Sequence, residues 1–436
     1  MSIIKISVGL GQYIEVDSSV QHLDLSFQRI KALPKQISSL TRLKSLNLSS
    51  SNIETLPEDI GNLIHLEVLN CSCTRITHLP ESIGQLKNLR ELHLSFSRVD
   101  ALVTGISELE NLEILDLTAC LIRHLNIDFS KFKKLRKLYL GYLSIKQVPD
   151  SIGALHALEE LTLNNTKIAV LPQSLAHLQA LKKLNLNYTS AIQDYSIVFE
   201  RLKELQDLNL EGTDIKDLTI YKPLCSKLMN LNLAKNKFKF FPAEFTKLRH
   251  LKSLDCSNTA LEHIASLAGL DQLKCLNLSN SKLTSLPNNI SDCKGLVHLD
   301  LSNTALTQLP RNIQSLNNLS ILNLYNTPIK GLNTHYLSFC AKKVFAALEK
   351  IQRANDEILE QREIENNTLI NLLLARIKTE LLLDMPACEI NVETDLAANA
   401  IRLSIVGCLE KETKHDLFNK ISLYLKGILP LQVYLN

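Results

Sequence analysis

Apolar residues recur along this chain with a spacing that fits neither an α-helix nor an ordinary strand. Within residues 43–63 they occupy seven positions: Leu43, Leu46, Leu48, Ile53, Leu56, Ile60 and Leu63. Leu46 and Leu48 flank Asn47, which is the alternation of a short strand with one buried face. Pro57 lacks an N–H group and suits an outer turn. The pattern predicts a short strand, a turn, and a segment that returns to the same interior.

The same pattern repeats along most of the sequence at an interval of roughly 23 residues. Further copies begin at Leu66, Leu89, Leu112, Leu135, Leu158, Leu181, Leu205, Leu228, Leu251, Leu273, Leu296 and Leu319. With a less regular first copy at Val20, these make about fourteen units between Val20 and Asn333. One unit leaves its leucines half exposed, whereas stacked units pair their strands in parallel and bury a continuous core. The sequence therefore predicts a solenoid over residues 20–333.

The repeated motif, L-x-x-L-x-L-x-x-x-x-[IL]-x-x-L-P-x-x-[IL]-x-x-L, resembles that of the leucine-rich repeat proteins. It is almost complete at residues 43–63, and residues 273–290 and 296–313 repeat it. Its Leu-Pro variety is similar to the intracellular Ras-binding group and to bacterial proteins. The resemblance implies an α/β solenoid, a leucine-rich repeat horseshoe with a parallel concave sheet. It also implies that a partner binds on the concave face.

The ninth position of each unit departs from the family pattern, in which asparagine is frequent and forms a ladder of buried amide hydrogen bonds. Here the column holds Ser51, Thr74, Ser97, Cys120, Leu143, Thr166, Thr189, Thr213, Asn236, Thr259, Ser281, Thr304 and Thr327. A hydroxyl has one donor where an amide has two, so it satisfies fewer loop carbonyls. We expect the fold to be retained with a weaker ladder.

Both ends of the chain depart from the leucine pattern. Alternating apolar residues in 1–19 predict a β-hairpin that turns at two glycines and caps the first unit. Helical spacing over 334–385 predicts a helical cap and connector, bent or broken at the polar stretch 362–368. Residues 386–436 predict a small α+β module of ββαβ order, with its helix near 413–425. Its unpaired strand edges suggest self-association.

Composition and charge narrow the class of protein. The formal net charge is +3 at pH 7, which argues against a broad nucleic-acid footprint. No apolar run approaches the ~20 residues that span a bilayer, and no secretory signal is evident near the N-terminus. Cys71, Cys120 and Cys256 occupy core positions, where a free thiol packs as a small hydrophobe. We expect a cytoplasmic protein with no membrane span; delivery into a host cell as a bacterial effector is the alternative.

The repeats carry no pattern that is typical of an active site. A G-x-x-x-x-G-K-[ST] phosphate-binding loop does not occur in the sequence. Cys71 and Cys73 resemble half of a zinc site, but Cys71 replaces a core leucine and no second pair lies at zinc spacing. The carboxylates of the C-terminal module have the pattern of a solvated strand face. We predict no catalytic, cofactor-binding or metal-binding residues, and no cofactor.

The concave surface is then the expected place of function. The third, fifth and seventh residues of each unit point out of the sheet, and the eighth lies at its edge. Most are small and polar, but larger side chains gather in the middle units, at His93, Phe96, Tyr139, Tyr142, Lys183 and Tyr188. Exposed aromatic residues are frequent in binding hot spots, so we predict a protein-binding site. The alternative is that these residues only pack on their neighbours across the sheet.

These inferences together predict an interaction scaffold that is not an enzyme and that recognises a protein partner on the concave face. The alternative is a bacterial effector or substrate receptor, in which the C-terminal module acts on the target that the repeats bind.

Overall fold

The computed structural model describes residues 3–9, 12–189, 201–218, 227–332, 340–381, 389–395, 400–406 and 432–435. Side chains are described up to residue 361, except at residues 8 and 9. The chain divides into two compact units, Met1–Ala347 and Leu348–Asn436.

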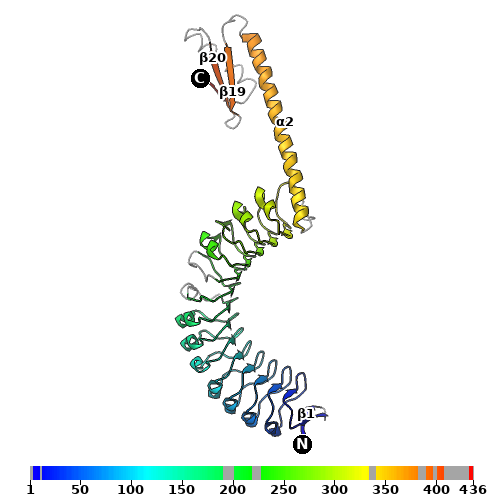
Figure 1. The fold of residues 1–436 in the computed structure, drawn as a ribbon, viewed down its shortest axis with the longest axis vertical. Helices are drawn as coiled ribbons and strands as arrows, with labels where there is room; N and C mark the ends of the chain where they lie inside the picture. Colours follow the sequence, from blue (N-terminus) through cyan, green and yellow to red (C-terminus); the bar gives the residue numbers. More distant parts are fainter. Residues whose placement is uncertain are drawn as a thin grey trace. The chain divides into compact units, whose positions relative to one another are not determined.

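A parallel sheet of 14 strands runs through the first unit, one strand for each repeat, and lines the inner face of its curve (Figure 1). The strands follow chain order: β3 (His22–Asp24), β4 (Ser45–Asn47), β5 (Val68–Asn70), β6 (Glu91–His93), β7 (Ile114–Asp116), β8 (Lys137–Tyr139), β9 (Glu160–Thr162), β10 (Lys183–Asn185), β11 (Asp207–Asn209), β12 (Asn230–Asn232), β14 (Ser253–Asp255), β16 (Cys275–Asn277), β17 (His298–Asp300) and β18 (Ile321–Asn323). The predicted leucine-rich repeat solenoid with its concave parallel sheet is confirmed.

The register of the sheet stacks equivalent residues of successive units. Leu161 pairs with Leu138 on one side and with Leu184 on the other. Leu161 and Leu163 are fully buried, while Thr162 between them is half-buried on the concave face. Each buried leucine contributes roughly 1.5–3 kcal/mol relative to an exposed one, so the stacked columns form the main source of stability.

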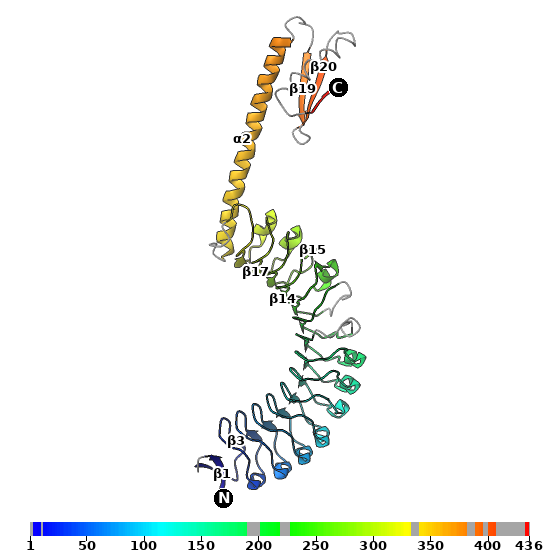
Figure 2. The ribbon, with the colours of Figure 1, turned by 180° about the vertical axis from the view of Figure 1, so that it is seen from behind.

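Short 3₁₀-helices cover the outer side of the curve. They are η1 (Lys35–Ser39), η2 (Glu58–Asn62), η3 (Glu81–Gln85), η4 (Thr104–Glu108), η5 (Phe129–Lys131), η6 (Asp150–Ala154), η7 (Gln173–His177), η8 (Ala243–Lys247), η9 (Asn288–Asp292) and η10 (Arg311–Ser315). A proline precedes eight of them, with its φ already suited to the turn. Val103 and Asp128 take that place before η4 and η5, so the turn survives without proline. A two-stranded pair, β13 (Phe240–Phe241) and β15 (His263–Ile264), also lies on this side (Figure 2).

The ninth-position side chains form hydrogen bonds mostly within their own unit. Nine hydroxyls donate to the carbonyl three residues earlier, from Ser51, Thr74, Thr166, Thr189, Thr213, Thr259, Ser281, Thr304 and Thr327. Asn236 instead joins two units: its amide donates to the carbonyls of Leu210 and Leu233 at 2.8 and 2.9 Å. The hydroxyl column therefore satisfies one carbonyl per unit, as the donor count predicts.

Both ends of the repeat array are covered. Strands β1 (Ile3–Gly9) and β2 (Gln12–Asp17) form the predicted antiparallel hairpin, with Ile4, Ile6 and Val16 buried. At the other end, helix α2 (Ala341–Leu381) begins against the last strand, where the Ala341 N–H donates to the carbonyl of Ser320 at 3.1 Å. Ala341 and Val344 are fully buried, so the first turn of α2 covers apolar surface of the final unit.

In the second unit, α2 continues to Leu381 as one helix. The predicted bend or break at 362–368 is therefore wrong. Strand β19 (Glu389–Asp395) pairs antiparallel with β20 (Ala400–Val406), which pairs in parallel with β21 (Gln432–Leu435). The helix expected near 413–425 lies outside the described residues. In the described ranges, no helix is both long and apolar enough to cross a membrane.

Candidate partner-binding surface

The fifth residue of most units caps its own strand. The Asn47 carboxamide oxygen accepts the N–H of Ser49 at 3.1 Å, in an Asx turn. The same bond is made by Asp24, Asn70, Asp116, Asn185, Asn209, Asn232, Asp255, Asn277, Asp300 and Asn323. Only the middle units place another residue there: His93, Tyr139 and Thr162. The small polar residues at this position therefore stabilise the turn that follows their strand.

The eighth residue of every unit has a left-handed backbone conformation, with φ between +52° and +63°. Five units place asparagine there, which tolerates this conformation: Asn165, Asn258, Asn280, Asn303 and Asn326. Four units instead place an aromatic residue there: Phe27, Phe96, Tyr142 and Tyr188. A bulky residue in this conformation costs on the order of 1–3 kcal/mol. The repeat spacing in the sequence predicted that these residues lie at the edge of the sheet. It did not predict their left-handed backbone conformation.

Three of these aromatic residues, Phe96, Tyr142 and Tyr188, form what we call the aromatic row. They stand two units apart, and 61%, 55% and 42% of their respective surfaces are exposed. Ala119 and Asn165 occupy the eighth position of the units between them. The row thus alternates large and small residues along one edge of the sheet.

Backbone hydrogen bonds hold the row at the spacing of the sheet. The N–H of Phe96 donates to the carbonyl of Thr118 in the next unit at 2.8 Å. Tyr142 and Tyr188 donate in the same way to Asn164 and Glu211, also at 2.8 Å. The backbone of the row is therefore fixed from unit to unit rather than free as in a loop.

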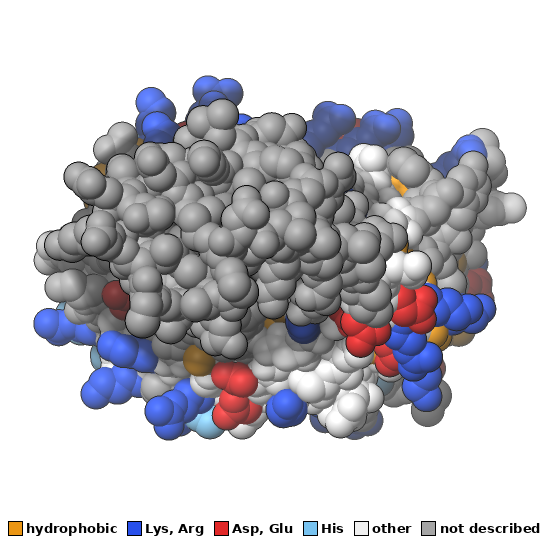
Figure 3. Space-filling model, turned by 90° about the horizontal axis from the view of Figure 1, so that it is seen from above, with side chains coloured by type: hydrophobic (Ala, Val, Ile, Leu, Met, Phe, Trp, Pro, Cys, Tyr) orange, Lys and Arg blue, Asp and Glu red, His pale blue; other side chains and the backbone are white. Residues whose placement is uncertain are grey.

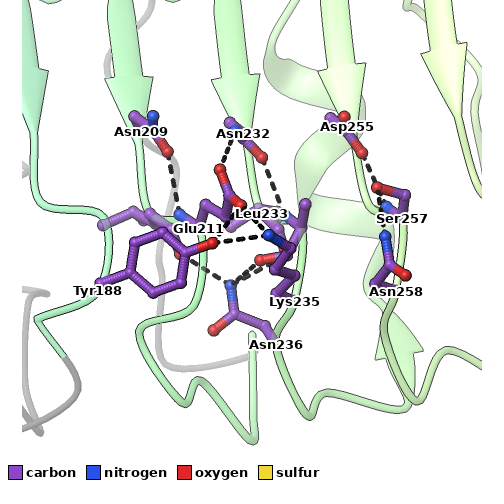
Figure 4. A network of polar contacts seen from close by, with 12 residues as sticks. Tyr188, Asn209, Glu211, Asn232, Leu233, Lys235, Asn236, Asp255, Ser257 and Asn258 are labelled. Carbon is purple, nitrogen blue, oxygen red and sulfur yellow. Dashed lines mark hydrogen bonds and ion pairs between the residues drawn. The ribbon is translucent and has the colours of Figure 1, made fainter.

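A polar network fixes the ring of Tyr188 (Figure 4). Its hydroxyl donates to Glu211 Oε1 at 2.8 Å and accepts from Lys235 Nζ at 2.7 Å. Lys235 Nζ also lies over the Tyr188 ring, 5.4 Å from its centroid, within the range of a cation–π contact. The ring lies over Gly212, where an added Cβ would come within 2.8 Å of its carbon atoms. Only glycine leaves room for the ring in this position.

Charge stabilises the same network. Burial opposes ionisation of Glu211, but hydrogen bonds from Lys235 and Tyr188 outweigh it and hold the pKa of this carboxyl below its usual value. The bonds to Tyr188 and Glu211 raise the pKa of Lys235. Both groups are therefore ionised near neutral pH, and Tyr188 is held between opposite charges.

Two other predicted site residues lie on the sheet face beside the row. His93 on β6 contacts Glu91 Oε2 through Nε2 at 3.0 Å, and its tautomer is not fixed by this contact. Tyr139 on β8 is half-buried, and burial together with the carboxylate of Glu160 raises its pKa to about 12. His93 is partly covered by Glu91 of its own strand and Tyr139 by Glu160 of the next strand, so both offer less free surface than the row.

Lys183, the sixth predicted residue, lines a hollow on the concave face. The hollow spans β9 to β14 and has a volume of about 410 Å³. Its charged lining is Glu160, Lys183, Asp207 and Asp255, and most of the remainder is asparagine and leucine. The structure thus places the predicted residues in three adjoining settings: the row, the sheet face and this hollow.

The metal site considered at Cys71 and Cys73 is not formed in the described part of the chain. No three His, Cys, Asp or Glu side chains gather there in a way that suits a metal ion. Cys71 is buried and Cys73 is exposed, so the two thiols do not converge. Burial raises the pKa of Cys71 to about 12, which keeps this thiol protonated. Seen from above, basic and acidic side chains both appear around the described surface (Figure 3).

The repeats match the family profile described as "Leucine-rich repeat region" over residues 20–138, 96–239 and 230–334. The chain therefore belongs to the leucine-rich repeat family. A solved leucine-rich repeat protein from Leptospira interrogans is 30% identical, with a TM-score of 0.59; the match covers 72% of this chain and 92% of that protein.

Two further similar solved structures are complexes with bound ligands. TLR13 in complex with single-stranded RNA is 28% identical, with a TM-score of 0.60, and the match covers 73% of this chain and 48% of that chain. The Arabidopsis receptor kinase HAESA in complex with the peptide hormone IDA is 25% identical, with a TM-score of 0.55, and the match covers 70% and 54%. This chain spans about half the length of each of these two chains.

Among curated proteins, the probable serine/threonine-protein kinase pats1 from Dictyostelium discoideum is 31% identical over 114 residues. The match covers 25% of this chain and 4% of that protein. A match over so small a share shows that the repeats of the two proteins are similar. It gives no reason to assign kinase activity to this chain.

Proposed function

We propose that this protein is a cytoplasmic interaction scaffold, whose repeats bind a segment of a partner protein at the aromatic row. His93 and Tyr139 widen the contact area on the sheet face, and Lys183 contributes a charge in the adjoining hollow. The observation that supports this proposal is the recurrence, at intervals of two units, of three exposed aromatic residues in a backbone conformation that disfavours them.

The stability of the fold does not explain why aromatic residues occupy these positions. Asparagine occupies the same position in five units and suits the left-handed conformation better. The conformational cost of a bulky residue there offsets the burial of the covered part of its ring. Exposed tyrosine and phenylalanine side chains, in contrast, supply large contact area at low rotamer entropy, which favours binding.

The charges beside the row favour a protein over a nucleic acid. Three carboxylates and one ammonium line the adjoining hollow, and carboxylates repel a phosphate backbone. Lys235, at the end of the row, is already paired with Glu211 at 2.9 Å. A peptide ligand, as in the HAESA complex, fits this surface better than the single-stranded RNA of the TLR13 complex.

A selection experiment tests this function although the partner is unidentified. A random dodecapeptide display library is selected on the immobilised intact chain and counter-selected on the double variant Phe96→Asn/Tyr142→Asn. Asparagine suits the backbone at both positions, so the variant keeps its fold. We expect enriched peptides that bind the wild type and not the variant. Enrichment of peptides that bind both proteins equally would place recognition elsewhere and overturn the proposal.

A further inference from the structure

The geometry of the aromatic row limits the conformation of what binds along it. Adjacent strands in a sheet are about 4.8 Å apart, and the N–H bonds from Phe96, Tyr142 and Tyr188 keep this spacing at the row. The row's residues are two units apart, so their Cα atoms recur at about 9.6 Å along the solenoid. A ligand that contacts successive rings in the same way needs a similar repeat.

Among regular backbone conformations, polyproline II has the repeat closest to this one. It has three residues per turn and a rise of about 3.1 Å, so equivalent side chains recur at about 9.3 Å on one face. In an extended strand, residues three apart span a similar length but point to opposite faces. In an α-helix, residues seven apart recur at about 10.5 Å, a mismatch that grows with each ring.

The bonding at the row gives a second reason to exclude strand addition. A peptide that extends a sheet needs free backbone N–H and C=O groups along the edge. The edge strands of this sheet are β3 and β18, whereas the row crosses the strands, and its N–H groups are used: that of Tyr142 bonds to Asn164, and that of Phe96 bonds to Thr118. A polyproline II ligand needs no such ladder, because it docks through aromatic side chains.

The residues between the rings argue against a bound helix. An amphipathic helix needs a nearly continuous apolar groove that receives anchors three, four and seven residues apart. The row places Asn165 between its last two rings and only a methyl group, Ala119, between its first two. Separate rings with small residues between them leave spaces at regular intervals. A polyproline II ligand presents one side chain per turn on the same face, which suits such spaces.

We propose that the ligand of this site is a proline-rich segment in the polyproline II conformation, lying along the row. Every third residue enters an interval between two rings, over Ala119 and over Asn165. Tyr188 lies over Gly212 and is held there by Lys235. The network that holds Tyr188 leaves this ring little to lose in entropy on binding. This inference rests on the proposed function and names the class of its ligand.

The test uses a fluorescein-labelled dodecamer of proline, titrated with the intact protein and followed by fluorescence anisotropy. A Gly-Ser dodecamer and a twelve-nucleotide oligouridine carry the same label and serve as comparison probes. We expect saturable binding of oligoproline that is at least about tenfold tighter than that of either other probe. Equal binding of the Gly-Ser probe overturns the conformational claim, and tighter binding of oligouridine would assign the row to RNA.

Variants test whether the spacing of the rings matters. Tyr142→Ala should weaken oligoproline binding about tenfold. Phe27→Ala is the matched control, since Phe27 has the same position and conformation but lies three units from Phe96; it should change binding less than twofold. The double variant Ala119→Tyr/Tyr142→Ala keeps the number of rings and moves one of them by a single unit. It should bind as weakly as Tyr142→Ala, and wild-type affinity in this variant would overturn the inference.

The outcomes separate the two claims. If peptides selected from the library depend on Phe96 and Tyr142 but oligoproline does not bind, the aromatic row is a binding site for another conformation, and only this inference fails. If neither the selected peptides nor oligoproline depends on the two rings, the proposed function fails with it.

Discussion

Replacing Asn236 with alanine should destabilise the repeats more than alanine replacement of any hydroxyl residue in the ninth column. The Asn236 amide donates to the carbonyl of Leu233 at 2.9 Å, and its oxygen accepts the N–H of Ile215 at 2.9 Å. In Asn236→Ala both backbone groups lose their bond while they remain buried. An orphaned buried group costs about 1–3 kcal/mol, so we expect a loss of about 4 kcal/mol.

Two comparison variants calibrate this value. Thr259→Ala removes one hydroxyl bond, to Cys256 at 2.8 Å, and should cost about 1–2 kcal/mol. Asn236→Thr restores the bond to the Leu233 carbonyl that other units make, but not the bond from the Ile215 N–H. Its loss of stability should therefore lie between those of Asn236→Ala and Thr259→Ala. The free energies of unfolding come from urea titrations of the intact chain. Equal destabilisation by Asn236→Ala and Thr259→Ala would refute the argument that this amide satisfies groups in two units.

Three further predictions concern the core, the charge network and the second unit. Leu161→Asp should cost more than about 4 kcal/mol, because it buries an unpaired charge, whereas Thr162→Asp, on the concave face, should cost less than about 1 kcal/mol. Similar melting temperatures would contradict the inward and outward assignment. The pKa of Glu211 is lowered in the folded state, so its stabilising effect is present above the ordinary glutamate pKa and is lost as the pH falls. The stability difference between wild type and Glu211→Gln should therefore shrink below about pH 4.5; a constant difference would show that ionisation is irrelevant. We propose that the second unit mediates self-association, so a chain ending at Gln361 should remain monomeric by light scattering at concentrations where the intact chain associates, and identical masses would contradict this.

Much of the fold followed from the spacing of the leucines. The period of two at Leu46 and Leu48 fixes which residues face inward, and a repeat of fixed length leaves in-register stacking as the way to bury them. The fourteen units and the parallel sheet could therefore be predicted. Helix α2 could not be predicted as one element, because the polar stretch at 362–368 has no apolar periodicity.

The candidate site was predicted less completely, for two local reasons. Spacing identified Phe96, Tyr142 and Tyr188 as large residues at the edge of the sheet, but their positive φ depends on the turn that joins each strand to the next segment. The recurrence of asparagine at this position was the sequence signal for that conformation. Asn47 and its equivalents were predicted only to point out of the concave sheet, whereas each also accepts a hydrogen bond from its own backbone. The recurrence of Asn or Asp at the fifth position of most units was the sequence signal for an Asx turn.

The central claim is that the aromatic row serves binding and not folding, and one variant measures both properties. Phe96→Asn/Tyr142→Asn is compared with wild type and with Phe27→Asn, using anisotropy titrations with peptides selected on the wild type, together with thermal melting. The account predicts that affinity for the double variant falls at least about tenfold, while its melting temperature stays within about 2 °C of wild type. Phe27→Asn should retain affinity. Unchanged affinity in the double variant, or an equal loss in Phe27→Asn, would contradict the account.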